Sequence, residues 1–277
     1  MIKRFIGGTK RLLRLHRPGR DLEVFPDDIF LVSYPKSGNT WTRFLVANLV
    51  YPNQPVDFAT INRLTPDPEA LSVRQLAQMP RPRIIKSHQY FDPRYQRIIY
   101  IVRDPRDVVL SEYHFNIKRG MIGENYPIEK FVASFLQLNI EQTYGTWAEN
   151  VASWFYVRGS DPEFLLIRYE DLQADGMREL ARIAEFLGIV PDPQRLTLAL
   201  ERSSADRMRE LERKQAHLWS STRQTRLDKP FVRTAESGGW KTELPQACAA
   251  EIESAWGKVM EDLGYELAVL SPQRKTQ

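Results

Sequence analysis

The segment Ile29–Trp41, IFLVSYPKSGNTW, joins an apolar run to a polar turn and then to a helical pattern. The run Ile29–Val32 is continuous and short, which is typical of a strand buried on both faces. Apolar side chains between Thr40 and Val50 then recur at helical spacing. The segment therefore predicts a strand, a tight turn and a helix in direct succession.

Three further apolar runs predict strands, and helical patterns follow two of them. The strands are Ile84–Ile85, Ile98–Val102 and Phe164–Ile167, and the helices run from Asp104-Pro105 to about Phe115 and from Glu170 to Leu187. Strands that alternate with helices predict an α/β fold: a central, mostly parallel sheet with helices on both faces. In such folds ligands bind beyond the carboxyl ends of the strands.

The chain is expected to hold a single domain. We place a basic arm at residues 1–22, the domain at 23–270 and a tail at 271–277. The stretches 51–82, 116–145 and 212–238 are expected to be irregular or weakly helical, and to shape a substrate site rather than to form separate domains.

Composition excludes several classes of protein. Of the 277 residues 42% are hydrophobic and 27% are charged, which fits an ordinary globular protein and not a disordered one. No apolar run reaches the length of a membrane span. A single cysteine, Cys248, excludes an intrachain disulfide, and together with only four histidines it argues against a Cys/His metal cluster. A reducing compartment, the cytoplasm, is therefore expected.

The net charge of +4 is unevenly distributed. Residues 1–20 carry seven cations and no acid, which leaves 32 cations against 35 acids elsewhere. A protein that coats nucleic acid is therefore not expected. The arm lacks the apolar core of a secretory signal. It is either a solvated extension or a basic segment in weak contact with an anionic membrane surface or an acidic partner, and Gly7-Gly8 and Pro18-Gly19 favour the first.

The turn after the first strand resembles a phosphate-binding loop in part. Gly38 and Thr40 fit the pattern G-x-x-x-x-G-K-[ST], but Ser33 replaces the first glycine and Asn39 replaces the lysine. The nearest lysine is Lys36, inside the loop. Backbone N–H groups and the helix dipole would still attract an anion. We expect a 5′-phosphate donor rather than ordinary ATP hydrolysis; the alternative is a plain turn with a solvated lysine.

Two other strand ends carry cations. Lys86 and His88 lie two residues apart, so they project from one face, and the cation would help to keep the imidazole neutral. Arg103 follows the Ile98–Val102 run and Ser111 lies on the next helix, where both could bind a phosphate. The alternatives are a structural histidine and an exposed ion pair between Arg103 and Asp104 or Asp107.

Taken together, six segments in order resemble the sulfotransferases that use 3′-phosphoadenosine 5′-phosphosulfate (PAPS), with the Lys-x-His element of the cytosolic branch. Residues 34–41 are similar to the 5′-phosphosulfate loop and residues 100–111 to the 3′-phosphate strand and helix. The others are K86-S-H88, Y169-E-D-L172, S203-S-A-D-R-M208 and F231-V-R-T-A-E-S-G-G-W-K241.

The resemblance implies a role for each matching residue. His88 would be the catalytic base, and Lys36 and Lys86 would stabilise the phosphosulfate bridge and the sulfuryl oxygens. The residues that would bind the donor are Lys36, Ser37, Gly38, Asn39, Thr40, Trp41, Arg103, Ser111, Tyr169, Ser203 and Arg233. Trp41, Tyr169 and Ser203 would bind on the adenine side, and Arg103, Ser111 and Arg233 would bind the 3′-phosphate.

The chain departs from the family pattern at four positions. Thr234 and Ala235 replace lysine and glycine in the late motif, and Gly239 replaces aspartate. One cation for the 3′-phosphate is thereby lost. Ala205 stands where an aromatic residue often covers the adenine. The family's dimerisation segment is not recognisable in residues 242–247, so no dimer is expected from the resemblance.

The function that the resemblance implies is in-line transfer of a sulfuryl group from PAPS to an acceptor hydroxyl, without a metal. The acceptor is a small molecule: a phenol, an alcohol, a lipid or a sugar. Two alternatives remain, a kinase that uses ATP and a catalytically silent nucleotide-binding module. Aromatic residues in the irregular stretches either line an apolar acceptor pocket or pack in the core: Tyr51, Phe58, Tyr90, Phe91, Tyr113, Phe115, Tyr126, Tyr144, Trp147 and Trp219.

Overall fold

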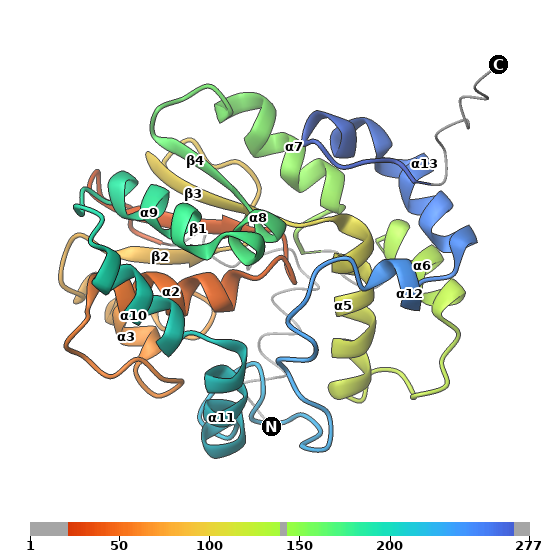
Figure 1. The fold of residues 1–277 in the computed structure, drawn as a ribbon, viewed down its shortest axis with the longest axis horizontal. Helices are drawn as coiled ribbons and strands as arrows, with labels where there is room; N and C mark the ends of the chain where they lie inside the picture. The colour runs from red at the N-terminus through yellow and green to blue at the C-terminus, as the bar shows by residue number, and fades with distance from the viewer. Residues whose placement is uncertain (1–21, 139–142, 269–277) are drawn as a thin grey trace.

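The four expected strands form one parallel sheet (Figure 1). A computed structural model describes residues 22–138 and 143–268 of the chain. The strands are β1 (Ile29–Ser33), β2 (Ile84–Ser87), β3 (Arg97–Val102) and β4 (Phe164–Arg168), in the order β2-β1-β3-β4. All three ladders are parallel, and Leu31 of β1 pairs with Lys86 on one side and Ile99 on the other. The prediction of a parallel sheet is confirmed.

Strand side chains alternate between two buried clusters, as a period of two requires. Phe30 and Val32 of β1 lie in one cluster with Tyr100 of β3, whereas Ile29 and Leu31 lie in the other. Every residue of β1 is buried. The continuous apolar run at residues 29–32 therefore reflects a sheet that is covered on both faces.

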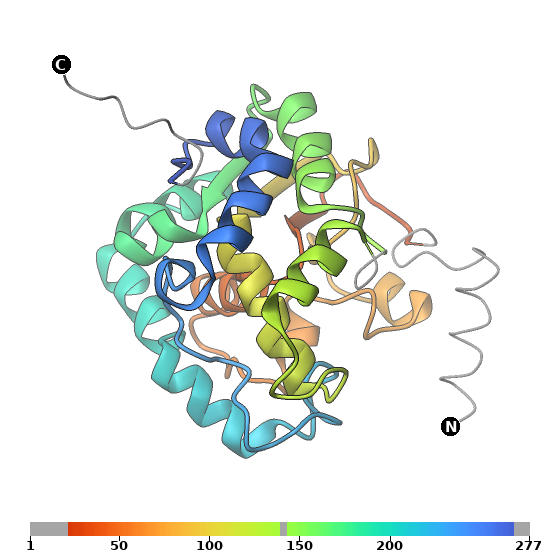
Figure 2. The ribbon, with the colours of Figure 1, turned by 90° about the vertical axis from the view of Figure 1, so that its right-hand side faces the viewer.

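Helices cover both faces of the sheet (Figures 1 and 2). On one face, the helices that contribute several residues to the cluster are α2 (Asn39–Val50), α9 (Gly176–Phe186) and α10 (Pro193–Arg202). On the other face they are α5 (Pro105–Lys118), α6 (Ile128–Leu136), α7 (Trp147–Arg158) and α13 (Gln246–Asp262). Figure 2 shows α13 beside α5 and α6, with which it is in contact. The remaining helices are α3 (Ile61–Leu64), α4 (Val73–Ala77), α8 (Tyr169–Ala174), α11 (Ala205–Gln215) and α12 (Trp240–Glu243).

Two predicted helices show how local signals act. The helix after β3 begins at Pro105 with Asp104 as its N-cap, as predicted, and its cap accepts a hydrogen bond from the Arg106 N–H. The expected single helix over Glu170–Leu187 is wrong, because α8 ends and α9 begins at Asp175. Asp175 leaves the helical conformation and caps α9 by accepting from the Arg178 N–H.

In their described residues, the three stretches that were expected to be irregular or weakly helical hold short helices and loops. Residues 51–82 hold α3 and α4, and residues 116–145 hold α6, which contributes buried side chains to the core. Among the described residues, no helix is both long and apolar enough to cross a membrane. The basic arm and the tail lie outside the described residues, apart from Leu22, and so does the suggested membrane contact of the arm.

Candidate active site

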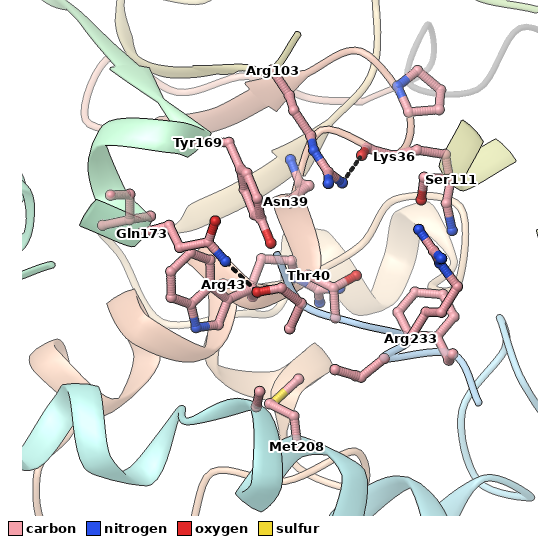
Figure 3. Close-up of a pocket in the computed structure, with 18 of the residues that line it drawn as sticks. Lys36, Asn39, Thr40, Arg43, Arg103, Ser111, Tyr169, Gln173, Met208 and Arg233 are labelled. Atoms are coloured by element: carbon pink, nitrogen blue, oxygen red, sulfur yellow. Dashed lines mark hydrogen bonds between the residues drawn. The ribbon is translucent and has the colours of Figure 1, made fainter. Parts of the chain in front are cut away.

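A cavity of about 770 Å³ lies where the strands end, and the loops after all four strands contribute to its lining (Figure 3). This is the edge at which parallel sheets bind ligands. The cavity is lined by all of the predicted site residues except Ser37 and Ser203: Lys36, Gly38, Asn39, Thr40, Trp41, Lys86, His88, Arg103, Ser111, Tyr169 and Arg233. Residues that are distant in the sequence are therefore gathered in one place.

The backbone of the loop after β1 requires a glycine at position 38. Gly38 has φ 93° and caps α2, and a Cβ there would lie 2.4 Å from Cδ2 of Tyr169. Glycine is thus required both by the left-handed conformation and by the ring beside it. Lys36 also has a positive φ, 65°. This turn directs the first N–H groups of α2 toward the cavity end of the sheet, where an anion would be stabilised.

Asn39, at the position of a Walker lysine, fixes the loop to the sheet. Its Nδ2 donates to the Leu31 carbonyl at 3.1 Å and to Ser33 Oγ at 3.2 Å. The side chain is almost fully buried. An amide that is engaged with β1 cannot take the part of a lysine that reaches the terminal phosphates of ATP.

The Lys36 ammonium lies between two aromatic rings. Its Nζ is 3.9 Å from the centre of the Phe115 ring and 4.7 Å from that of Phe231. Burial lowers the pKa of Lys36 from its ordinary value to about 8, and nearby arginines lower it while Glu112 opposes them. An anion bound at this lysine would therefore favour its charged form.

Lys86 is held by a buried acid that sequence reasoning missed. Its Nζ lies 2.9 Å from Oδ2 of Asp67, and the two side chains are 14% and 7% exposed. Burial alone would raise the pKa of Asp67, but Lys86 and the buried Arg43 guanidinium hold that pKa below its usual value. Asp67 stands between two prolines in the stretch 51–82, and no local pattern marks it as a partner of Lys86.

His88 lies beside Lys86 at the end of β2, and its orientation is fixed by β1. Its Nδ1 is 2.7 Å from the Ser33 carbonyl, which can only accept, so Nδ1 carries the proton and Nε2 has a free lone pair. Burial first and Lys86 second lower the pKa of His88 to about 4. The imidazole is therefore neutral at ordinary pH, chiefly because of burial and only partly because of the neighbouring cation.

Arg103 and Arg233 line the cavity from segments far apart in the sequence, together with Ser111 (Figure 3). Arg103 donates to the carbonyls of Lys36 at 3.4 Å and Glu236 at 2.9 Å, and its guanidinium lies 4.3 Å from the Tyr169 ring centre. It is 3.8 Å from Asp107. The suggested ion pair with Asp107 therefore exists, but Arg103 is largely buried rather than exposed.

The adenine-side residues differ in how they take part. Trp41 and Tyr169 both line the cavity, with ring centres 5.5 Å apart in an edge-to-face arrangement. Ser203 does not line it: its carbonyl accepts from Trp41 Nε1 at 2.9 Å and its Oγ accepts from Asn48. Ser203 therefore orients Trp41. Ser37 is also fully buried, and its hydroxyl has no partner among the described residues.

The cavity contains further residues that were not among the predicted site residues. Gln173 donates to the Ala235 carbonyl and joins α8 to the late loop (Figure 3). Ala205, where an aromatic residue often covers the adenine in the family, and Met208 line the cavity from α11. Of the aromatic candidates for an acceptor pocket, Phe115, Tyr144 and Trp219 line the cavity, although Tyr144 and Trp219 are also buried members of the core clusters. Phe58 and Trp147 are buried in the core and do not line the cavity.

The fold and the cavity define an α/β protein with a phosphate-binding turn, and comparison with known proteins identifies its family. A model of the sulfotransferase domain matches residues 26–264. Rat sulfotransferase 1E1 is 29% identical over 266 residues, which cover 87% of each chain. Dog sulfotransferase 1B1 is 32% identical over 179 residues, 58% of this chain and 59% of the relative. The chain therefore belongs to the sulfotransferase family, as its motifs indicated, and it is a sulfotransferase.

Solved structures share the fold. Retinol dehydratase in complex with androsterone and the inactive cofactor PAP aligns with a TM-score of 0.68 and 21% identity, covering 87% of this chain and 83% of that one. Mouse sulfotransferase SULT7A1 complexed with PAP aligns with a TM-score of 0.66 and 23% identity, covering 87% and 86%. The expected α/β fold with a P-loop-like turn is thereby confirmed.

Proposed function

We propose that this chain transfers a sulfuryl group from PAPS to the hydroxyl of a small molecule, with His88 as the base. The observation that carries the proposal is the meeting of two strand ends: the Lys36 loop after β1 and the Lys86–His88 pair after β2 line one cavity. A donor phosphate and an acceptor hydroxyl can therefore be held within reach of each other. Such positioning supplies much of the catalysis in a transfer reaction.

The donor is expected to span the cavity from Trp41 to Arg233. The N–H groups of the loop and Lys36 would bind the 5′-phosphosulfate, with Thr40 adding its hydroxyl. Trp41 and Tyr169 would pack against the adenine. Arg103, Ser111 and Arg233 would bind the 3′-phosphate. The two structural neighbours were solved in complex with PAP, which supports such a nucleotide for the present chain.

The transfer step follows from the positions of His88 and Lys86. The acceptor oxygen attacks the sulfur, a new S–O bond forms, and the bond from sulfur to the 5′-phosphate oxygen breaks on the opposite side. Nε2 of His88 takes the hydroxyl proton, for which it is suited because Nδ1 is engaged with Ser33. Lys36 and Lys86 balance the charge on the leaving oxygen and the sulfuryl group. In this proposal these groups supply the electrostatic stabilisation that a metal supplies in other transfer reactions.

The acceptor is proposed to bind beside His88 and Tyr144, whose ring centres are 5.6 Å apart. The aromatic lining by Phe115, Tyr144 and Trp219 suits a phenol, an alcohol or a lipid, and polar groups nearby leave room for a sugar. The match over residues 26–264 supports one catalytic domain at 23–270. A cytoplasmic location is proposed from the single cysteine, Cys248, which is buried and unpaired.

Two measurements test the function. Thermal unfolding is followed with adenosine 3′,5′-bisphosphate and, separately, with ATP and Mg²⁺; we expect stabilisation by the bisphosphate. Transfer of labelled sulfate from PAPS is then screened over phenols, alkyl alcohols and sugars. Stabilisation by ATP–Mg²⁺ alone would contradict the proposal and favour a kinase.

A further inference from the structure

The carboxylate of Glu243 forms an ion pair with the Arg233 guanidinium. Oε1 of Glu243 lies 2.6 Å from Nη1 of Arg233, and the two side chains are 34% and 31% exposed. The other oxygen, Oε2, lies 3.1 Å from Nε2 of His114 on α5. Glu243 is the last residue of α12, so it follows directly from the late motif that carries Arg233. It thus bridges two groups at one edge of the cavity.

The surroundings of Arg233 hold less free positive charge than its sequence motif suggests. Thr234 is neutral where the late motif has a lysine. Arg103 already donates to two backbone carbonyls and lies near Asp107. A guanidinium has five donors, so Arg233 can bind a phosphate and Glu243 together. The carboxylate and the phosphate then share one cation and repel each other.

We propose that Glu243 is a specificity-determining residue, which weakens recognition of the nucleotide's 3′-phosphate by pairing with Arg233. This inference rests on the proposed function, in which Arg233 faces that phosphate. Glu243 lowers the preference of the site for a 3′-phosphorylated nucleotide over one without that group. It also favours release of the product, adenosine 3′,5′-bisphosphate, because the product carries the same 3′-phosphate as the donor PAPS.

The alternative role for Glu243 is to orient Arg233 toward the phosphate. The two roles predict opposite signs when the carboxylate is removed. Glutamine at this position keeps the shape of the side chain and can still accept a hydrogen bond from Arg233, but it carries no charge. Glu243→Gln therefore separates repulsion from orientation.

The test is calorimetric titration of the full chain with adenosine 3′,5′-bisphosphate and with adenosine 5′-monophosphate, which lacks the 3′-phosphate. In Glu243→Gln we expect about 2- to 5-fold tighter binding of the bisphosphate, the range of partly exposed ion pairs, and unchanged binding of the monophosphate. The difference should shrink as salt is raised. The control is Glu251→Gln, which removes an exposed charge on α13 outside the cavity lining and should change neither affinity.

Three results would overturn the inference: unchanged bisphosphate binding in Glu243→Gln, weaker binding, or equal tightening for both nucleotides. Glu243→Ala is the second variant, and it must also favour the bisphosphate. Weaker binding by both variants would mean that Glu243 orients Arg233. Failure of the proposed function looks different, because the unaltered chain would then transfer no labelled sulfate from PAPS, whatever its affinities for the two nucleotides. Thermal unfolding without nucleotide checks that each variant is folded.

Discussion

The two ends of the cavity each pair a cation with a carboxylate, but the surroundings of the two pairs differ. Lys86 meets Asp67 in a nearly buried setting, whereas Arg233 meets Glu243 at the exposed edge. Electrostatic interactions are stronger where water is excluded, and a buried charge left without its partner is costly. The same type of contact should therefore have opposite consequences: Asp67 supports its lysine, and Glu243 competes for its arginine.

The largest effect is expected at His88, next to the buried pair. His88→Ala removes the base and should lower turnover by about 10²–10⁴-fold. Binding of adenosine 3′,5′-bisphosphate should be retained, because the residues that are proposed to bind it are untouched. Rates from labelled PAPS and calorimetric affinities measure the two quantities. Normal turnover in the variant would refute the role of His88.

A smaller loss is expected when Lys86 loses its partner. Asp67→Asn should lower turnover at saturating donor by about 10-fold, since one misplaced stabilising charge costs about 1.4 kcal/mol of barrier. Bisphosphate affinity should change little. Glu163→Gln is the control, because Glu163 pairs with Arg97 in a more exposed setting and lies outside the cavity lining. Equal losses in the two variants would contradict a specific effect of the pair.

At the exposed edge the effect should be weaker and of another kind. Arg233→Gln should weaken bisphosphate binding by about 5-fold, a loss of about 1 kcal/mol. Turnover at saturating donor should stay nearly the same, because Arg233 is remote from the transferred group in the proposed mode of binding. Titrations with the bisphosphate and with adenosine 5′-monophosphate measure this. A fall in turnover that matches the loss at Asp67 would remove the distinction between the two ends.

The smallest effect concerns pH. The active imidazole is neutral, so activity should fall as pH drops through the His88 pKa, about 4, well below the ordinary value. Lys86 is one cause of that low pKa. Lys86→Met should therefore move the acid limb upward, by about one pH unit or less. The pH dependence of kcat/KM measures the shift, and a limb that stays in place would show that Lys86 does not act on His88.

Local patterns predicted the parts of the molecule that depend on neighbours in sequence. The run at Ile29–Val32 and the Asp104-Pro105 pair marked a strand and a helix start, and strand ends marked Lys36, His88 and Arg103. The roles of Asp67 and Glu243 were not predicted, because each meets its partner only when segments that are separated in sequence fold together. Ser203 was expected to bind nucleotide, but its side chain turns to Asn48.

The contact of Gly38 with Tyr169 has a consequence for how the site responds as a unit. The same ring packs against the phosphate loop, the Trp41 ring and the Arg103 guanidinium. Three groups that are proposed to bind different parts of the donor thus all pack against one side chain. A preorganised site loses little conformational entropy on binding. A substitution of Tyr169 should therefore weaken binding of both the adenine and the phosphates of the donor. The loss of binding free energy should not divide into independent adenine and phosphate contributions.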